Sequence, residues 1–206
     1  ANRYYCHPMA AYSIPAAEHS TITAWQRQGE ESAYRNMIEQ FAKPGSLVAV
    51  VSDSYDLWNA IDYLWGDRLK QAVIESGATV VIRPDSGDPV EIVGKVLERL
   101  EDRFGSTLNQ KGYKVLNHVR VIQGDGVNEE SITEILQRVE QLGFSATNLA
   151  FGMGGALLQQ LNRDTQKFAI KCSEVIVNGE AIAVYKDPIT DPGKRSKRGR
   201  LVLLKT

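Results

Sequence analysis

The sequence predicts an α/β fold in which parallel strands form a partial (half) TIM-like barrel. Apolar runs rich in Val and Ile, typical of strands buried on both faces, occur at Leu47–Val51, Ala78–Ile82, Val119–Gln123 and Asn148–Phe151. Stretches with helical periodicity alternate with them, at Ser54–Trp65, Val90–Phe104, Asn128–Leu142 and Gly155–Arg163. Because strand–helix alternation favours parallel strands, these four units correspond to half of an eight-stranded barrel.

Two further regions flank the barrel units. Thr21–Phe41 has helical character and is expected to form two segments broken near Gly29. In residues 166–206 the alternation of strands and helices stops, which predicts a β-rich extension with a basic loop. Its strands are expected at Phe168–Val177, Ala181–Tyr185 and Leu201–Leu204. We therefore predict one domain over residues 1–206, with barrel units in 1–165. Half a barrel leaves open sheet edges, so we expect the rest to come from another segment or the chain to be a fragment.

Composition and charge exclude several classes of protein. With 24 Lys plus Arg and 25 Asp plus Glu, the net charge of -1 provides no general field for nucleic acid or a membrane surface. No apolar run approaches the roughly 20 residues of a membrane span, and no signal peptide is visible. Cys6 and Cys172 read as reduced thiols, which predicts a cytoplasmic protein. The chain opens on Ala1 rather than Met, which reads as an entry in mid-protein.

Polar residues cluster where each predicted strand ends. Asp53, Asp85 and Asp125 follow the first three strands. Carboxyl ends of parallel strands lie at one edge of a sheet, so these side chains should meet. A single Asp there is more often a helix cap, but the repetition favours a site. Asp53 and Asp85 suit Mg²⁺, Asp125 between two glycines suits ribose hydroxyls, and Arg83 suits a phosphate or a flat ring.

Phosphate-binding features complete the predicted site. Gly152–Gly155, which contains Gly154 and Gly155, precedes a predicted helix, where backbone N–H groups can face a phosphate. The C-terminal loop carries a run of cations that would hold an anion-rich ligand: Lys186, Lys194, Arg195, Lys197, Arg198 and Arg200, with Lys171 and Arg163 as additions. Such runs are more often solvated surfaces. His7 and His118 are assigned structural roles, as a lone His usually is.

Several of these segments together resemble a known family. The segment Ser13–Trp25, with Pro15-Ala16-Ala17-Glu18-His19-Ser20-Thr21 at its centre, is similar to the catalytic-histidine segment of the nicotinamide phosphoribosyltransferases. Val51–Asp56, Ile82–Gly87, Val121–Val127 and Phe151–Leu158 follow in that family's order, and then Lys186-Asp187-Pro188 through Arg200. The resemblance covers essentially the whole chain and implies the type II phosphoribosyltransferase fold.

The resemblance also implies a reaction and residue roles. The family joins nicotinamide to phosphoribosyl pyrophosphate, giving nicotinamide mononucleotide and pyrophosphate for NAD salvage; it requires Mg²⁺ and is stimulated by ATP through a phosphohistidine. His19, beside Glu18, would be phosphorylated, and Asp53 and Asp85 would organise magnesium and substrate. The implied substrate contacts are Arg83 for nicotinamide, Gly124 and Asp125 for ribose, and Gly154, Gly155, Arg163, Lys171, Lys186, Lys194 and Arg200 for phosphates. A homodimer with its active site at the subunit interface is also implied.

Other readings remain open from the residues. Nicotinate is the alternative base, because the groups that select the base lie upstream of this chain in the family. A barrel lyase or isomerase acting on a sugar phosphate would use the same Gly-rich site, although a monophosphate needs fewer cations. The isolated chain could also be an inactive fragment that binds phosphate weakly.

Overall fold

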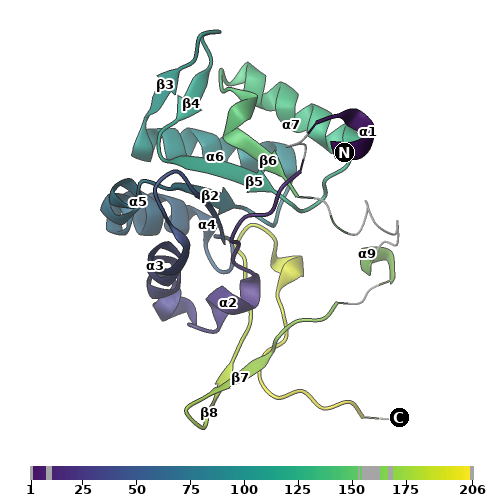
Figure 1. Cartoon of the computed structure of the whole chain (residues 1–206). Coiled ribbons are helices and arrows are strands. Elements are labelled where there is room, and N and C mark those ends of the chain that lie inside the picture. Colours follow the sequence, from purple (N-terminus) through teal and green to yellow (C-terminus); the bar gives the residue numbers. More distant parts are fainter. Residues whose placement is uncertain (1, 8–10, 153, 155–162, 167–168, 205–206) are drawn as a thin grey trace.

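The computed structural model describes residues 2–7, 11–152, 154, 163–166 and 169–204 (Figure 1). Its centre is a sheet of four parallel strands in the order β1-β2-β5-β6. These strands are β1 Leu47–Val51, β2 Thr79–Arg83, β5 Val119–Gln123 and β6 Leu149–Phe151. The α/β class with a parallel sheet is therefore confirmed, and in the described residues this sheet is open rather than closed into a barrel.

Helices cover the face of the sheet that carries alternate apolar strand residues. Val48, Val50, Val80, Ile82 and Val121 pack in one core with helical side chains. The helices that supply those side chains are α3 Glu30–Phe41, a π-helix at Ala60–Arg68, α5 Lys70–Ser76, α6 Pro89–Phe104 and α7 Glu129–Gln141. They lie around one side of the strands in Figure 1. The loops that follow the four parallel strands lie together at the carboxyl edge of this sheet.

Local sequence signals explain where the two longest helices begin. The Asp88 side chain accepts a hydrogen bond from the backbone N–H of Glu91, and Pro89 takes the first helical position of α6. Asn128 and Ser131 form a reciprocal capping box at the start of α7. Both caps lie just after strand ends, so they fix the loops at which the predicted site residues lie.

The remaining elements are short. They are α1 Asn2–Tyr5, α2 His19–Thr23, α4 Leu57–Asn59, α9 Arg163–Gln166 and 3₁₀ turns at Arg27–Gly29, Ala146–Asn148 and Pro192–Lys194. Two antiparallel hairpins lie outside the sheet, β3 Ser106–Leu108 with β4 Lys114–Leu116, and β7 Glu174–Val177 with β8 Glu180–Ala183. The second hairpin projects away from the sheet (Figure 1). No helix in the described part of the chain is long and apolar enough to cross a bilayer.

Several predicted elements differ from the structure. Residues 201–204 form no strand and their side chains are exposed, because they pair with none of the described strands. Of the strand expected over Phe168–Val177, residue 168 lies outside the described residues and the described part forms a strand only at Glu174–Val177. The β3–β4 hairpin was not predicted. The helix expected over Ser54–Trp65 begins at Leu57 and continues to Ser76. Of the helix expected at Gly155–Arg163, residues 155–162 lie outside the described residues.

Candidate active site

An unpredicted bridge places the histidine segment at the carboxyl edge of the sheet. Ala16 pairs with Ala49 in parallel, and the backbone N–H of Ala17 donates to the carbonyl of Ala49 at 2.9 Å. The chain therefore runs alongside β1 before α2 begins at His19. Because the pairing is parallel, Glu18 and His19 emerge at the same edge as Asp53, which follows β1.

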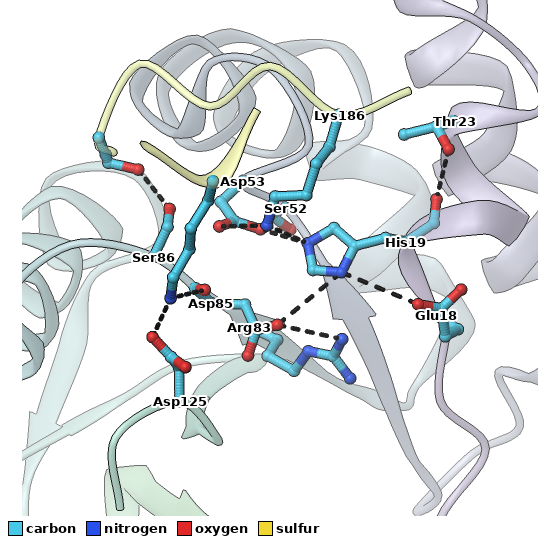
Figure 2. Close-up of polar contacts among 12 residues, drawn as sticks. Glu18, His19, Thr23, Ser52, Asp53, Arg83, Asp85, Ser86, Asp125 and Lys186 are labelled. Carbon is cyan, nitrogen blue, oxygen red and sulfur yellow. Dashed lines mark hydrogen bonds and ion pairs between the residues drawn. The ribbon is translucent and has the colours of Figure 1, made fainter. Parts of the chain in front are cut away.

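His19 forms a buried polar cluster with Asp53 and Lys186. His19 Nε2 lies 2.9 Å from Asp53 Oδ1 and 3.1 Å from Lys186 Nζ, and Lys186 Nζ lies 3.8 Å from Asp53 Oδ2. Asp53 is fully buried, and His19 and Lys186 are 5% exposed. Figure 2 shows the three side chains converging from α2, the loop after β1 and the C-terminal segment. Because a ring nitrogen is either donor or acceptor, a neutral His19 hydrogen-bonds Asp53 or Lys186 but not both through Nε2.

The cluster shifts the pKa values of its two charged members. Burial by itself raises the pKa of Asp53, but the hydrogen bond with His19 and the charge of Lys186 together outweigh it and lower this pKa to about 2. Burial also lowers the pKa of Lys186, against the opposing effect of Asp53 and Asp85. Asp53 is thus a fixed anion at neutral pH, held between an imidazole and an ammonium group.

The other face of the imidazole meets two more carboxylates. His19 Nδ1 lies 3.8 Å from Asp85 Oδ2 and 4.0 Å from Glu18 Oε1. Asp85 Oδ2 is also 3.7 Å from an Arg83 terminal nitrogen (Figure 2). Glu18 caps α2 by accepting from the backbone N–H of Ser20. A reactive Nδ1 would therefore sit beside two anions and one guanidinium.

Asp125 and Lys194 extend the site along the sheet edge. Lys194 Nζ forms an ion pair with Asp125 Oδ2 and donates to the backbone carbonyl of Asp85 at 3.2 Å. Gln123, at the end of β5, donates from Nε2 to the Asp125 carbonyl at 2.7 Å and so holds the loop that follows the strand. Gly124 lies beside Asp85, since a Cβ there would be 3.7 Å from Asp85 Oδ1.

A C-terminal segment, residues 184–196, brings the lysines to this edge. The backbone N–H of Asp187 donates to the Ser54 carbonyl at 2.9 Å, and that of Ile189 donates to the Tyr55 carbonyl at 3.1 Å. Thr190 hydrogen-bonds Ser86 through their hydroxyl groups. These contacts cross the loops after β1 and β2, which is how cations over 100 residues away in sequence reach Asp53 and Asp85.

Two adjoining pockets open over the cluster. One, of about 200 Å³, is lined by Glu18, His19, Lys171, Tyr185 and Lys186 among others. A larger one, of about 530 Å³, is lined by Asp85, Asp125, Lys171, Lys186 and Lys194 among others. Lys171 and Lys186 border both, so the two pockets share a cationic boundary suited to phosphate oxygens.

The geometry divides the pair of aspartates predicted to hold Mg²⁺. The His19 ring lies between Asp53 and Asp85, with one nitrogen facing each. Asp53 Oδ1 pairs with His19 and Asp53 Oδ2 lies 3.8 Å from Lys186 Nζ, and Asp53 lines neither pocket, whereas Asp85 lines the larger one. The described residues contain no group of three or more His, Cys, Asp or Glu side chains suited to a metal. Asp85 therefore fits a magnesium that takes one carboxylate plus phosphate oxygens and waters better than Asp53 does.

The predicted site residues separate into two groups. Ten are brought together at this edge: Glu18, His19, Asp53, Arg83, Asp85, Gly124, Asp125, Lys171, Lys186 and Lys194. Gly154 and Arg200 are exposed and line neither pocket. Gly155 and the side chain of Arg163 lie outside the described residues. Sequence reasoning missed Ser86, Thr190 and Tyr185 as site residues. The Lys186-Asp187-Pro188 motif could have drawn attention to Tyr185 and Thr190, and the neighbouring Asp85 to Ser86.

The fold and the site define an α/β protein with a lysine-lined site at the carboxyl edge of a parallel sheet. A model of the nicotinate phosphoribosyltransferase (NAPRTase) family matches residues 3–205. The chain belongs to this family.

Relatives and a solved structure agree with this assignment. The chain is 64% identical over 205 residues to the nicotinamide phosphoribosyltransferase of Xanthomonas campestris pv. campestris (strain 8004), covering 100% of this chain and 44% of the relative. It is 39% identical to that of Mycoplasma pneumoniae, over 93% of this chain and 45% of the relative. The chain thus spans a little under half the length of these relatives. A crystal structure of nicotinate phosphoribosyltransferase from Vibrio cholerae shares the fold, with a TM-score of 0.58, 15% identity, and coverage of 90% of this chain and 41% of that one.

Proposed function

We propose that this chain is the C-terminal catalytic part of a nicotinamide phosphoribosyltransferase. The reaction transfers a phosphoribosyl group from phosphoribosyl pyrophosphate to nicotinamide and yields nicotinamide mononucleotide and pyrophosphate for NAD salvage. Relatives named nicotinamide phosphoribosyltransferase, at 64% and 39% identity, support the choice of base over nicotinate. The observation that carries the proposal is the buried His19–Asp53–Lys186 cluster beside two cation-lined pockets.

The site suits the charge changes of this reaction. The nicotinamide ring nitrogen forms a bond to the anomeric carbon while the carbon–oxygen bond to pyrophosphate breaks, so that positive charge builds on the ribose ring and the leaving group takes the electron pair. Asp85 and Asp125 line the larger pocket as anions near the ribose, and Lys171, Lys186 and Lys194 line it as cations for the leaving oxygens. A bound Mg²⁺, with Asp85 as its carboxylate ligand, would supply further neutralisation of the pyrophosphate charge.

His19 is the proposed acceptor in ATP stimulation. In the tautomer with its proton on Nε2, that N–H donates to Asp53 and the Nδ1 lone pair faces Glu18 and Asp85. Nδ1 then attacks the γ-phosphorus of ATP, the bond from that phosphorus to the bridging oxygen breaks, and ADP leaves with the electron pair. The phosphohistidine is subsequently hydrolysed by water. Asp53 fixes the ring throughout by accepting from Nε2, and Lys186 lies beside Nε2, on the side of the ring away from the phosphoryl group.

Assays of the whole protein test this proposal. We expect nicotinamide and phosphoribosyl pyrophosphate to give nicotinamide mononucleotide, measured by chromatography, and ATP to increase the yield. His19→Ala should abolish the ATP effect while the exposed His7→Ala retains it. Absence of product with both nicotinamide and nicotinate would overturn the proposal. Equal calorimetric affinity for ribose 5-phosphate and phosphoribosyl pyrophosphate would favour a sugar-phosphate lyase or isomerase instead.

Two parts of the proposal concern the assembly. The resemblance implies a homodimer whose active site lies between subunits, which light scattering on the whole protein would measure. We also propose that the 206-residue chain by itself is inactive, because the relatives are more than twice its length. Turnover by the isolated chain would contradict that statement.

A further inference from the structure

The residue before Asp53 is held by a fully buried network of hydrogen bonds. Ser52 is 0% exposed, and its hydroxyl donates to the Val50 carbonyl at 3.0 Å. The same oxygen accepts a hydrogen bond from the indole Nε1 of Trp65, also at 3.0 Å. The Ser52 backbone N–H donates to the Arg83 carbonyl on β2. Ser52 is thus fixed by three separate contacts where β1 ends and the site begins.

Trp65 reaches Ser52 from an unusual helix. It is fully buried and lies within the π-helix Ala60–Arg68, where the backbone N–H of Leu69 donates to the Leu64 carbonyl at 2.8 Å. π-helices usually occur as single turns, often at functional sites, whereas this one has nine residues. The wider helix changes the direction in which each side chain points relative to an α-helix of the same sequence. Its conformation therefore determines where the indole N–H points.

A second layer of buried contacts holds Trp65. The ring of Tyr34 on α3 stacks on the indole with centroids 4.6 Å apart and planes at 13°. The Tyr34 hydroxyl donates to Glu30 Oε1 at 2.9 Å, and Glu30 is only 3% exposed. Burial is the main cause that raises the pKa of Glu30 to about 7. Glu30, Tyr34, Trp65 and Ser52 thus form a continuous chain of contacts, the buried support, that begins at α3 and ends beside Asp53.

We propose that Trp65 is a positioning residue for the reaction: through Ser52 it fixes Asp53, and through Asp53 it fixes the orientation of the His19 ring. Trp65 lines neither pocket over the cluster, so its effect passes through the backbone of Ser52 and Asp53. Asp53 depends on this support because His19 and Lys186 both come from segments outside the sheet. This inference rests on the proposed phosphoribosyl transfer for its kinetic test.

Two substitutions remove the same hydrogen bond from its two sides. Trp65→Phe keeps a ring to stack on Tyr34 but deletes the N–H donor, and Ser52→Ala deletes the acceptor. Trp58→Phe is the matched control: Trp58, on neighbouring α4, packs under the Arg99 guanidinium at 4.9 Å, and its indole N–H makes none of the described hydrogen bonds. Thermal unfolding of each variant checks that the fold is retained.

The kinetic arm uses the whole protein with nicotinamide, phosphoribosyl pyrophosphate and ATP. We expect Trp65→Phe and Ser52→Ala each to lower kcat about tenfold, the effect of losing one buried hydrogen bond, with KM for nicotinamide unchanged. The double variant Trp65→Phe/Ser52→Ala should have the same kcat as the less active single variant, because the same hydrogen bond is lost in all three. Wild-type kcat in Trp65→Phe, or multiplicative losses in the double variant, would overturn the inference.

A spectroscopic arm separates this inference from the proposed reaction. The ¹⁵N chemical shifts of the His19 ring nitrogens report its tautomer, and His19→Ala identifies these signals in the whole protein. We expect Trp65→Phe and Ser52→Ala to shift both ring signals toward a mixture of tautomers, and Trp58→Phe to leave them in place. If the wild type transfers no phosphoribosyl group, the proposed function fails and these shifts still decide the inference. Unchanged shifts in Trp65→Phe would refute it.

Discussion

At the scale of single residues, the site is governed by two charges removed from water. Asp53 and Lys186 are 0% and 5% exposed, and Lys186 Nζ lies 3.8 Å from Asp53 Oδ2. Breaking a buried ion pair by removing one partner costs roughly 3–5 kcal/mol, because the remaining charge stays buried. We therefore expect Asp53→Asn to lower the free energy of unfolding by about that amount in urea titrations near neutral pH.

A surface pair gives the matched control for this substitution. Asp187 pairs with Arg195 at 3.2 Å, but the Arg195 side chain is 67% exposed. Asp187→Asn should therefore cost no more than about 1 kcal/mol, as exposed pairs do. Asp53 also makes the free energy of unfolding depend on pH, because its pKa in the folded protein is about 2 and its ordinary pKa is 3.8. The stability that the ionised Asp53 contributes is therefore fully present above pH 3.8 and is lost as the pH falls through the folded pKa. Equal losses in the two variants would contradict the role given to burial.

Lys194 carries the prediction for the larger pocket. Its ammonium group contacts Asp125 and the Asp85 carbonyl, so it stands where a phosphate oxygen and the ribose hydroxyls would bind. We expect Lys194→Ala to raise KM for phosphoribosyl pyrophosphate about tenfold with a smaller change in kcat. Lys111→Ala, an exposed lysine in the β3–β4 loop, serves as the control. Steady-state kinetics at low and high salt would measure the difference, and an unchanged KM would argue against the assignment.

At the scale of elements, the apolar runs predicted the sheet well because the central positions of β1 and β2 are buried one after another. Leu47–Val51 and Val119–Gln123 are strands with the predicted bounds. The π-helix could not be predicted, because its i to i+5 bonding leaves no distinct periodic pattern and depends on tertiary packing of Trp65. The Ala16–Ala49 bridge is equally invisible in sequence, since a single parallel pair needs no apolar run. Residues 201–204 show the reverse error, an apolar run without a partner strand in the described chain.

Gly66 provides a test of how tightly the π-helix is packed. A Cβ at this position would lie 2.7 Å from the Ile61 carbonyl oxygen and 2.5 Å from Arg103 Cγ. The arginine side chain can move, but the carbonyl belongs to the helix backbone. We expect Gly66→Ala to destabilise the protein by roughly 1–3 kcal/mol, opposite to its gain in helix propensity. Asp67→Ala, at the exposed next position, is the control in thermal unfolding. A more stable Gly66→Ala variant would show that the helix can relax.

At the scale of the whole molecule, the site exists only because distant segments meet. The strand-end aspartates were predictable from sequence, since a parallel sheet places all carboxyl ends at one edge. Which carboxylate pairs with which cation was not predictable: Lys186 reaches Asp53 and Lys194 reaches Asp125 because residues 184–196 cross two loops. The predicted magnesium pair shows what sequence could not reveal. The Ala16–Ala49 bridge brings the His19 ring between Asp53 and Asp85, so the two carboxylates do not face each other directly.

Glu30 links the global stability of the fold to pH near neutrality. Burial, opposed by the Tyr34 hydrogen bond and the charge of Arg27, raises its pKa from 4.5 to about 7. Between pH 4.5 and about pH 7 the folded protein keeps a proton on Glu30 that the unfolded chain has lost. The free energy of unfolding is therefore highest below pH 4.5 and decreases as the pH rises through the folded pKa of about 7. The integrated loss is roughly 3 kcal/mol. Glu30→Gln keeps an acceptor for Tyr34 but cannot ionise, so we expect it to remove this loss.

Urea unfolding of the wild type and of Glu30→Gln at about pH 5 and about pH 8 gives the change in unfolding free energy between the two pH values for each protein. The difference between these two changes measures the effect of Glu30. Glu31→Gln is the control, because Glu31 lies on the same helical turn but is partly exposed and paired with Arg35. We expect its pH dependence to follow the wild type, while that of Glu30→Gln is flatter by most of the predicted loss. Parallel curves for Glu30→Gln and the wild type would mean that Glu30 is ionised without penalty. The buried support would then carry a full negative charge next to Tyr34, in conflict with the burial of both residues.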